Sequence, residues 1–427
     1  MIRNFLVALF LFASLTIAAQ RTSSSPYSYF GIGDEFSNRT VEQNAMGGIG
    51  VAFSHYKYLN FTNPASLADL RYTTYSLGAL NNDLRIETNS TNQSSTSTSL
   101  SYIALAFPLG NKATFSLGMQ PLSSIGYSLT NSVSDTSGNL TQVTLFQGNG
   151  GVNRIYGAIG ARIFKDLALG IEADFSFGRL ENSILTQRAD VILATKYTEN
   201  SNVRGGSVKL GVLYKKELKN ELTLNAGASF RLSSELSVKG EDNLYSVALS
   251  TVESPRDTIS SGLIDGTFNL PLKSTFGLGL GKSDKWYIGV EYENQDAFST
   301  TGLLANTTGA YRYDSSNRIS VGGYYLPKIN SISSYWDRIT YRAGVRFENT
   351  GLLIDGTGAN NNFSDIKDFG ISFGLGLPLK RLSTVNLGFE FGKRGTIENN
   401  LVEENYFNLR LSLSLTDVNW FVKRKID

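Results

Sequence analysis

The chain has 427 residues, with 39 Lys and Arg against 37 Asp and Glu, so its formal net charge is only +2. This balance argues against a nucleic-acid-binding protein, which needs a basic surface. Cysteine is absent and His55 is the single histidine, which excludes disulfides, thiolate chemistry and metal sites built from several histidines. We therefore expect no cofactor, no metal and no nucleic-acid partner.

Residues 1–19 have the layout of a secretory signal peptide. Arg3 precedes an apolar run that begins at Phe5 and gives way to small residues. The run is shorter than the ~20 residues that a membrane-spanning helix needs, although an N-terminal anchor is the alternative. No later apolar run approaches ~18 residues. We expect an exported protein, either soluble or located in the bacterial outer membrane as a barrel.

Residues 20–70 differ from the rest of the chain because they carry no strand pattern. Gly47, Gly48 and Gly50 permit tight or left-handed backbone, and Asn63 followed by Pro64 favours a turn. Irregular backbone is tolerated at membrane depth when protein encloses it. We predict that residues 20–70 form a plug, or hatch, inside a barrel.

From residue 71 to residue 419, apolar and polar residues alternate in runs of about ten, the pattern of strands with one face in lipid and one in a polar lumen. In the last run, Leu409 and Leu411 alternate with Arg410 and Ser412. The pattern predicts an all-β fold: a transmembrane antiparallel β-barrel of about 14 strands. A soluble sandwich is the alternative, but it would not bury the charged faces.

Short turns in this interpretation alternate with longer polar segments, which we expect to be outer loops. The expected loops lie near residues 84–97, 124–149, 180–203, 236–266, 296–312, 350–365 and 394–405. Residues 420–427 follow the last strand as a short basic periplasmic tail.

Charged residues on the inward faces of the strands are expected to meet in the lumen. They include Arg154, Glu172, Asp174, Glu291, Arg342, Arg346, Glu390 and Arg410. Buried charges need partners, which favours a neutralised network that braces barrel and hatch. The alternative is a polar ion path, as in a porin.

Together, the signal peptide, about 14 strands and a glycine-bearing plug with Asn63, Pro64 and Ala65 make the chain similar to the FadL-type family of outer-membrane transporters of hydrophobic compounds. In that family a hatch with an Asn-Pro-Ala motif precedes a 14-stranded barrel. The resemblance implies that Gly47, Gly48, Gly50, Asn63, Pro64 and Ala65 belong to a hatch or gate. It also implies that Tyr27, Tyr29 and Phe30 contact ligand, although simple packing of the hatch is the alternative.

The resemblance further implies passive uptake of a hydrophobic small molecule, such as a long-chain fatty acid or aromatic hydrocarbon, with lateral exit through the wall. Expected partners are outer-membrane lipid, this substrate and the barrel-assembly machinery during biogenesis. Two other functions stay open: a barrel that serves exported protein partners, and a general porin. We expect no enzymatic activity, because the Gly-x-Ser-x-Gly match at residues 370–374 lies inside an alternating strand run and not on the strand-to-helix elbow that a nucleophilic serine needs, and His55 lies in the hatch.

Overall fold

The structure is a computed structural model that describes residues 24–89, 91–249, 253–301, 309–358, 360–379 and 382–417. The expected signal peptide at residues 1–19 and the expected tail at residues 420–427 lie outside the described residues. Across the described ranges, no helix combines the length and the apolar character needed to span a membrane.

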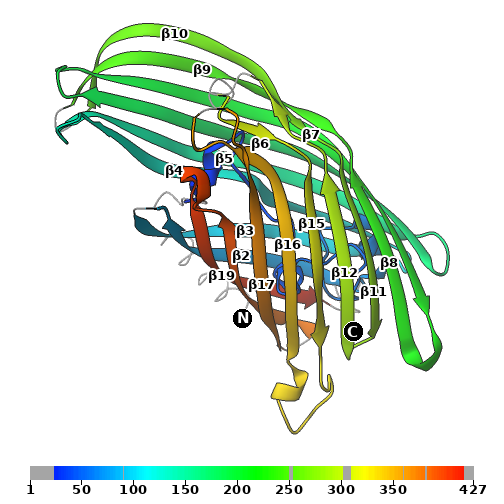
Figure 1. Ribbon diagram of the computed structural model, residues 1–427. Coiled ribbons are helices and arrows are strands. Elements are labelled where there is room, and N and C mark those ends of the chain that lie inside the picture. The colour runs from blue at the N-terminus through cyan, green and yellow to red at the C-terminus, as the bar shows by residue number, and fades with distance from the viewer. Residues whose placement is uncertain are drawn as a thin grey trace, which may run out of the picture.

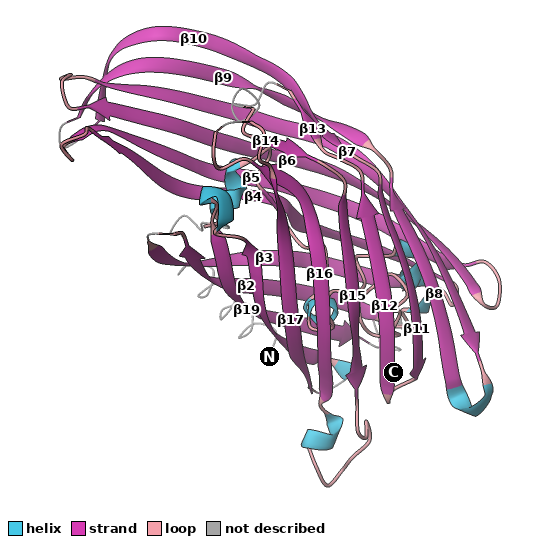
Figure 2. Ribbon diagram, in the orientation of Figure 1, coloured by secondary structure: helices cyan, strands magenta, loops and turns pink. Residues whose placement is uncertain are grey.

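The described strands form one closed antiparallel barrel of 14 wall strands, which confirms the predicted fold class and strand number (Figures 1 and 2). Fifteen residue pairs between the last strand and β2 close it, from Glu403–Glu87 to Asp417–Thr73. The first six wall strands are β2 (Thr73–Glu87), β3 (Asn92–Leu109), β4 (Ala113–Ser134), β5 (Leu140–Arg162), β6 (Leu167–Arg188) and β7 (Ala194–Glu217). The last four are β16 (Thr340–Ile354), β17 (Ser364–Pro378), β18 (Thr384–Gly395) and β19 (Glu403–Asp417).

Four wall strands between β7 and β16 are each interrupted, so that each consists of two pieces. The pieces are β8 (Leu222–Arg231) with β9 (Ser234–Leu249), β10 (Glu253–Leu270) with β11 (Lys273–Lys282), β12 (Trp286–Gln295) with β13 (Ser299–Thr300), and β14 (Tyr311–Tyr313) with β15 (Ser316–Tyr325). β7 pairs with both β8 and β9, which shows that the two pieces follow one another along the same neighbour.

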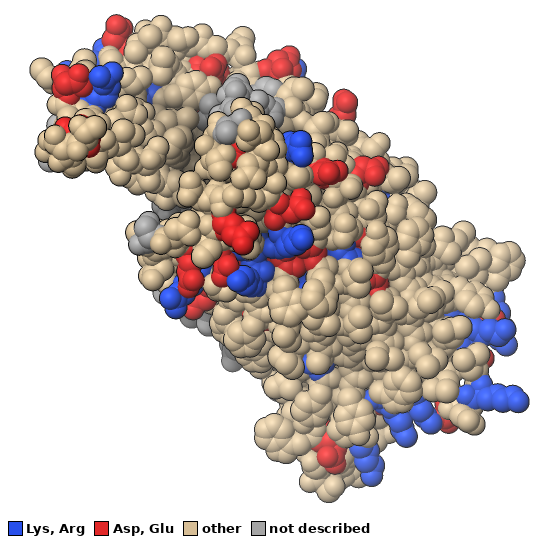
Figure 3. Space-filling view, viewed as in Figure 1, with Lys and Arg blue, Asp and Glu red and all other residues tan. Residues whose placement is uncertain are grey.

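Side chains alternate between the two faces of the wall as the sequence pattern requires. Outward residues such as Leu278, Ile288, Phe373 and Leu411 are about half exposed, whereas inward residues such as Ser412 are buried. A belt of exposed apolar side chains around a polar interior is the surface of a barrel that lies in lipid. Figure 3 shows a band of the wall that carries few charged side chains.

The outer ends of the strands correct one expectation. Most residues predicted as long outer loops are strand: β4 to β7 have 22, 23, 22 and 24 residues, and only 135–139 and 189–193 connect their outer ends. A strand needs only about 9–11 residues to cross a bilayer. The strands therefore continue beyond the bilayer as an extension, here called the outer sheet (Figure 1). It consists of β4 beyond Ser123, the parts of β5, β6 and β7 that pair alongside it, and β9 with β10.

The strands are polar on both faces in much of the outer sheet because both faces leave the lipid. The alternation that marks a membrane strand is therefore lost, and the segments resemble loops in sequence. At the base of the outer sheet, its concave face holds a buried apolar cluster that includes Ile125, Val152, Leu180, Val203 and Val238.

β3 and β4 part at the outer margin of the apolar belt. Their pairing ends at Ile103–Met119, after which β3 continues beside β2 and β4 beside β5. Beyond this point β3 exposes Leu100 and then the polar Thr98 and Thr96. The wall is therefore interrupted between β3 and β4, and the outer part of this interruption is bordered by polar side chains of β3.

Residues 24–70, here called the N-terminal segment, lie largely buried in the barrel. They contain η1 (Pro26–Tyr29), β1 (Asp34–Glu35), α2 (Val41–Asn44) and η2 (Pro64–Asp69). Thr40 and Gln43 form a capping box at the start of α2, and Asn63 caps η2 with Pro64 in its first position. β1 adds to the edge of β4 as a short antiparallel strand.

Candidate functional site

The Asn63-Pro64-Ala65 turn docks against a row of wall glycines. Gly160, Gly170 and Gly211 lie side by side on β5, β6 and β7. A Cβ atom on Gly170 would lie 2.3 Å from the Ala65 nitrogen, a distance that atoms cannot adopt. The backbone of the turn can therefore approach the wall only because these positions lack side chains.

A second row of wall glycines receives the Gly47 turn. Gly322 and Gly344 face each other on β15 and β16, and a Cβ atom on either would lie within 2.3 Å of the backbone at Met46 or Gly47. Gly47 and Gly48 have φ values of +70° and +83°, the left-handed region that glycine tolerates. Gly50 adopts no such angle, but a Cβ there would meet the buried Gln43 and Thr62 side chains.

Asn63 ties the turn both to itself and to the wall. Its side-chain amide nitrogen donates to the carbonyl oxygens of Val51 (2.7 Å) and Val212 (2.9 Å), and its side-chain oxygen accepts from the Ala65 nitrogen (3.0 Å). Asn63 is fully buried. Its three bonds hold the motif in one orientation.

We expect Asn63→Ala to loosen the N-terminal segment by about 3 kcal/mol, because the variant loses these bonds and leaves buried carbonyls without the Asn63 donor. Limited proteolysis of the segment measures the effect, while heat-modifiable migration reports an intact barrel. Asn63→Asp should act in the same direction, since it keeps the acceptor but loses both donors. Asn111→Ala, at an exposed position, is the neutral control. If Asn63→Ala, Asn63→Asp and Asn111→Ala resist protease equally, Asn63 does not fasten the segment to the wall.

The inward charges that the sequence analysis selected, apart from Arg342, belong to three ionic clusters. In the first, Arg154 and Lys209 each lie 2.9 Å from the Glu172 carboxylate, and Asp174 lies 3.5 Å from Arg154. Lys209 also donates to the Phe61 carbonyl oxygen of the N-terminal segment at 2.9 Å. This cluster thus joins the wall to the segment while balancing its own charge.

The second cluster is centred on Glu291 of β12. Arg39 lies 3.0 Å from both Glu291 and Glu293, and Arg318 lies 3.0 Å from Glu293. The other Glu291 oxygen accepts from the backbone nitrogens of Gly50 and Val51, each at 2.7 Å. One buried carboxylate therefore holds three groups of the N-terminal segment.

The third cluster lies on β16 to β19, where Arg346 contacts Glu348 (2.8 Å), Asp368 (3.0 Å) and Glu390 (2.9 Å). Glu390 also pairs with Arg410. Arg342 stands apart: its guanidinium donates to Asn386 at 3.2 Å and lies 5.4 Å from the Tyr58 ring centre.

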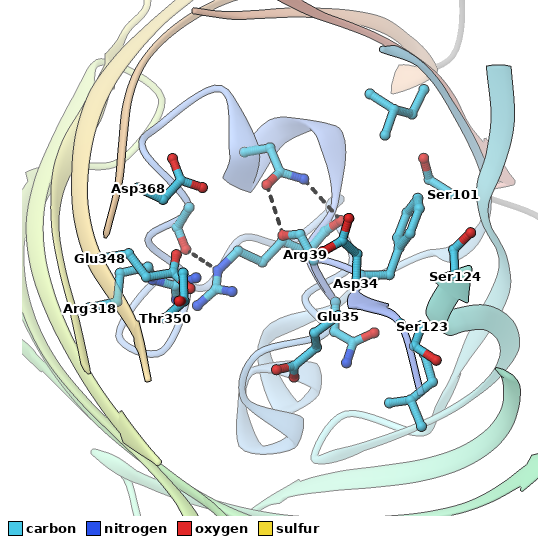
Figure 4. A pocket seen from close by; sticks show the side chains of 18 of the residues that line it. Asp34, Glu35, Arg39, Ser101, Ser123, Ser124, Arg318, Glu348, Thr350 and Asp368 are labelled. Atoms are coloured by element: carbon cyan, nitrogen blue, oxygen red, sulfur yellow. Dashed lines mark hydrogen bonds between the residues drawn. The ribbon is translucent and has the colours of Figure 1, made fainter. Parts of the chain in front are cut away.

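A cavity of about 370 Å³ lies between the N-terminal segment and the wall. Nine basic and seven acidic side chains are among its lining residues. Figure 4 shows Arg39 near its centre, Arg318, Glu348 and Asp368 on one side, and the serines of β3 and β4 on the other. Since Ser101 belongs to β3 and Ser123 to β4, the cavity lies beside the interruption in the wall.

The three aromatic residues that the resemblance associates with ligand occupy different places. Phe30 and Tyr27 line the cavity, but Tyr27 is buried under the Arg394 guanidinium and its hydroxyl donates to the Val402 carbonyl. Tyr29 is outside the cavity lining and packs edge-on against Tyr127, with the ring centres 5.2 Å apart.

His55 lies in a cluster of tyrosine rings near the turn between β11 and β12. It stacks on Tyr56 at 4.5 Å, and its Nε2 atom is 3.7 Å from the Asp284 carboxylate. Burial lowers the pKa of His55 to about 4, and Asp284 opposes the shift only in part. The imidazole is therefore neutral near pH 7.

The structure adds several residues to the site that the sequence analysis did not select. Lys209, Arg318 and Asp368 follow the same inward alternation as the residues that were selected, so that signal was available. Arg39 belongs to a segment without a period, and no sequence signal singles it out. Among the described residues, no group of three or more His, Cys, Asp or Glu side chains is arranged to hold a metal ion.

The closed 14-stranded wall, with its N-terminal segment inside, defines an outer-membrane β-barrel of the fold expected from the FadL-type resemblance. Similar solved structures include the CymD monoaromatic hydrocarbon channel (14% identity, TM-score 0.57, covering 90% of this chain and 99% of that one). The toluene transporter TbuX of Ralstonia pickettii is also similar, with 14% identity and a TM-score of 0.57 over 92% of this chain and 99% of that one. A Pseudomonas aeruginosa FadL homologue has 11% identity and a TM-score of 0.59 over 90% of this chain and 98% of that one. At these identities the likeness establishes the fold.

The chain belongs to the BamG family, whose model matches residues 1–427. No curated protein sequence gives a significant match.

Proposed function

We propose that this protein is an outer-membrane barrel that serves a protein partner in the assembly of other outer-membrane proteins. The family name points to the barrel-assembly machinery. The observation that carries the proposal is the outer sheet: β4 to β7 have 22 to 24 residues, about twice the length that a bilayer requires. Crossing the bilayer does not by itself account for this ordered surface outside the lipid.

The interior supports the same function. The N-terminal segment is fastened to the wall by ionic clusters and glycine contacts, and we propose that it acts as a hatch that closes the lumen. The cavity above it is lined by many charges, whereas sites for apolar compounds are mostly apolar with few polar groups. The fastened segment argues against an open porin, and the charged cavity argues against a site for an apolar compound.

The test is purification of the tagged chain from native outer membranes. We expect components of the barrel-assembly machinery to co-purify in fixed ratio, and depletion of the chain to slow the folding of newly exported barrels. Recovery of the chain alone, with unchanged folding of other barrels after depletion, would overturn the proposal.

Uptake of a hydrophobic small molecule is the second candidate, favoured by the interruption between β3 and β4 beside the cavity. On this alternative, the long-chain fatty acid or aromatic hydrocarbon passes the cavity and leaves sideways, and Phe30 contacts it. Cells that lack the chain should then take up radiolabelled oleate or toluene more slowly, and the wild-type chain should restore the rate. Equal uptake in both strains counts against this candidate.

A further inference from the structure

One edge of the outer sheet is open along most of its length. β4 pairs with β5 as far as Ser134 on one side. On its other side, β3 pairs with β4 only between Ala113 and Met119, and β1 pairs with Ser123 and Ser124. Within the ranges that the structure describes, no strand pairs with this edge from Tyr127 to Ser134. Residues 128 and 130–134 are exposed, so this part of the edge is accessible.

The backbone groups of this edge have a defined direction. The Phe36 nitrogen donates to the Leu122 carbonyl at 2.9 Å, and the Gly126 nitrogen donates to the Ser28 hydroxyl at 3.1 Å. Even-numbered residues here thus point their backbone groups away from β5. The β4–β5 register is regular from Ser123 to Val133, so Ser128, Thr130 and Ser132 continue the same row.

The chain's own β1 demonstrates that extended backbone binds this row. Asp34 pairs with Ser124 and Glu35 with Ser123, in antiparallel sense. β1 has only two residues and does not reach past Gly126. The outward backbone groups of Ser128, Thr130 and Ser132 therefore continue the same row without a partner strand from β1.

The opposite edge of the outer sheet offers an internal comparison. β10 carries Pro255, Arg256 and Asp257 and has register shifts at 255/257 and 258/260. Proline, charge and bulges are the devices by which natural sheets prevent edge-to-edge pairing. The edge of β4 from Ser128 to Ser134 has neither proline nor charge, and its register is irregular only at its end.

We propose that the β4 edge from Ser128 to Ser132 binds an extended backbone segment of a partner protein as an added antiparallel strand, in the sense that β1 shows. The inference deepens the proposed partner role and rests on it. A second copy of this chain fits less well. β4 runs outward from the membrane, so two copies in one membrane would bring their β4 strands together parallel, opposite to the sense that β1 shows.

Hydrogen–deuterium exchange resolved to single amides tests the proposal on the full chain, isolated and in the co-purified complex. The Leu129 and Asn131 amides point to β5 and serve as protected references. The Ser128, Thr130 and Ser132 amides should exchange quickly in the isolated chain and at least about 100-fold more slowly in the complex. A complex that forms while these amides stay fast overturns the edge inference and leaves the partner role standing.

Failure to recover any complex overturns both proposals. Protection that rises with the concentration of the isolated chain assigns the edge to a second copy and overturns the inference as stated.

A matched pair of variants gives an independent reading. Thr130→Pro removes the outward N–H without removing a bond to β5, because the ring replaces only that donor. Thr130→Val keeps the donor and nearly the same side-chain shape. We expect co-purification of the partner to fall about tenfold with proline and to stay unchanged with valine; equal recovery with both would contradict strand addition.

Discussion

Gly170→Val is expected to drive the N-terminal segment away from the barrel wall and to open a path for ions. The new Cβ would lie 2.3 Å from the Ala65 nitrogen and from the Pro64 carbonyl carbon. These are backbone atoms of a turn that Asn63 fixes, so they cannot yield as a flexible side chain would. Overpacking of this kind costs about 1–3 kcal/mol or more.

Single-channel conductance in planar bilayers measures the result. The wild-type chain should pass little current and the variant markedly more, while heat-modifiable migration shows that the barrel still forms. Gly157→Val is the matched control on β5, because its Cβ would meet only Phe115, at an ordinary 3.8 Å. A large open current in the wild-type chain would itself contradict a plugged lumen.

Glu291→Ala is expected to release the middle of the N-terminal segment. The variant loses the acceptor for the Gly50 and Val51 nitrogens and one of the two carboxylate partners of Arg39. Removal of one member of a buried ionic cluster costs about 3–5 kcal/mol, because the remaining charge is left uncompensated. We expect trypsin to cleave after Arg39, which is 7% exposed in the intact protein.

Glu291→Gln separates the two parts of this effect, since it keeps an acceptor for the amides but loses the charge opposite Arg39. Its rate of cleavage should lie between those of the wild-type chain and Glu291→Ala. The control is Glu217→Ala, which replaces an exposed glutamate at the end of β7. If trypsin cleaves all of these variants at the wild-type rate, Glu291 does not fasten the segment.

The wall of this barrel is encoded locally, and the sequence was sufficient to predict it. Leu409 and Leu411 face outward while Arg410 and Ser412 face inward because successive side chains of a strand point to opposite faces. In lipid, only a closed barrel satisfies the backbone groups of such strands. The period of two therefore predicted both the fold class and the 14 strands.

The outer sheet was mistaken for loops because its signal is not local. Residues 128–134 of β4 contact water on much of their surface, so nothing selects alternating apolar residues there. They are strand because β5 hydrogen-bonds to them along their whole length, and that pairing is not recorded in the composition of the segment itself.

The candidate site divides in the same way. Alternation placed Glu172, Glu291 and Glu390 in the lumen, but it could not assign their partners, because each pairing depends on strand register and on the path of the N-terminal segment. Arg39 reaches Glu291 across 252 positions of sequence. The sequence by itself determined which face of each strand is polar, through the period of the pleat. Only the tertiary structure decided that Gly170 receives the Asn63 turn and that β4 carries an open edge, because both depend on the approach of backbones that no local pattern records.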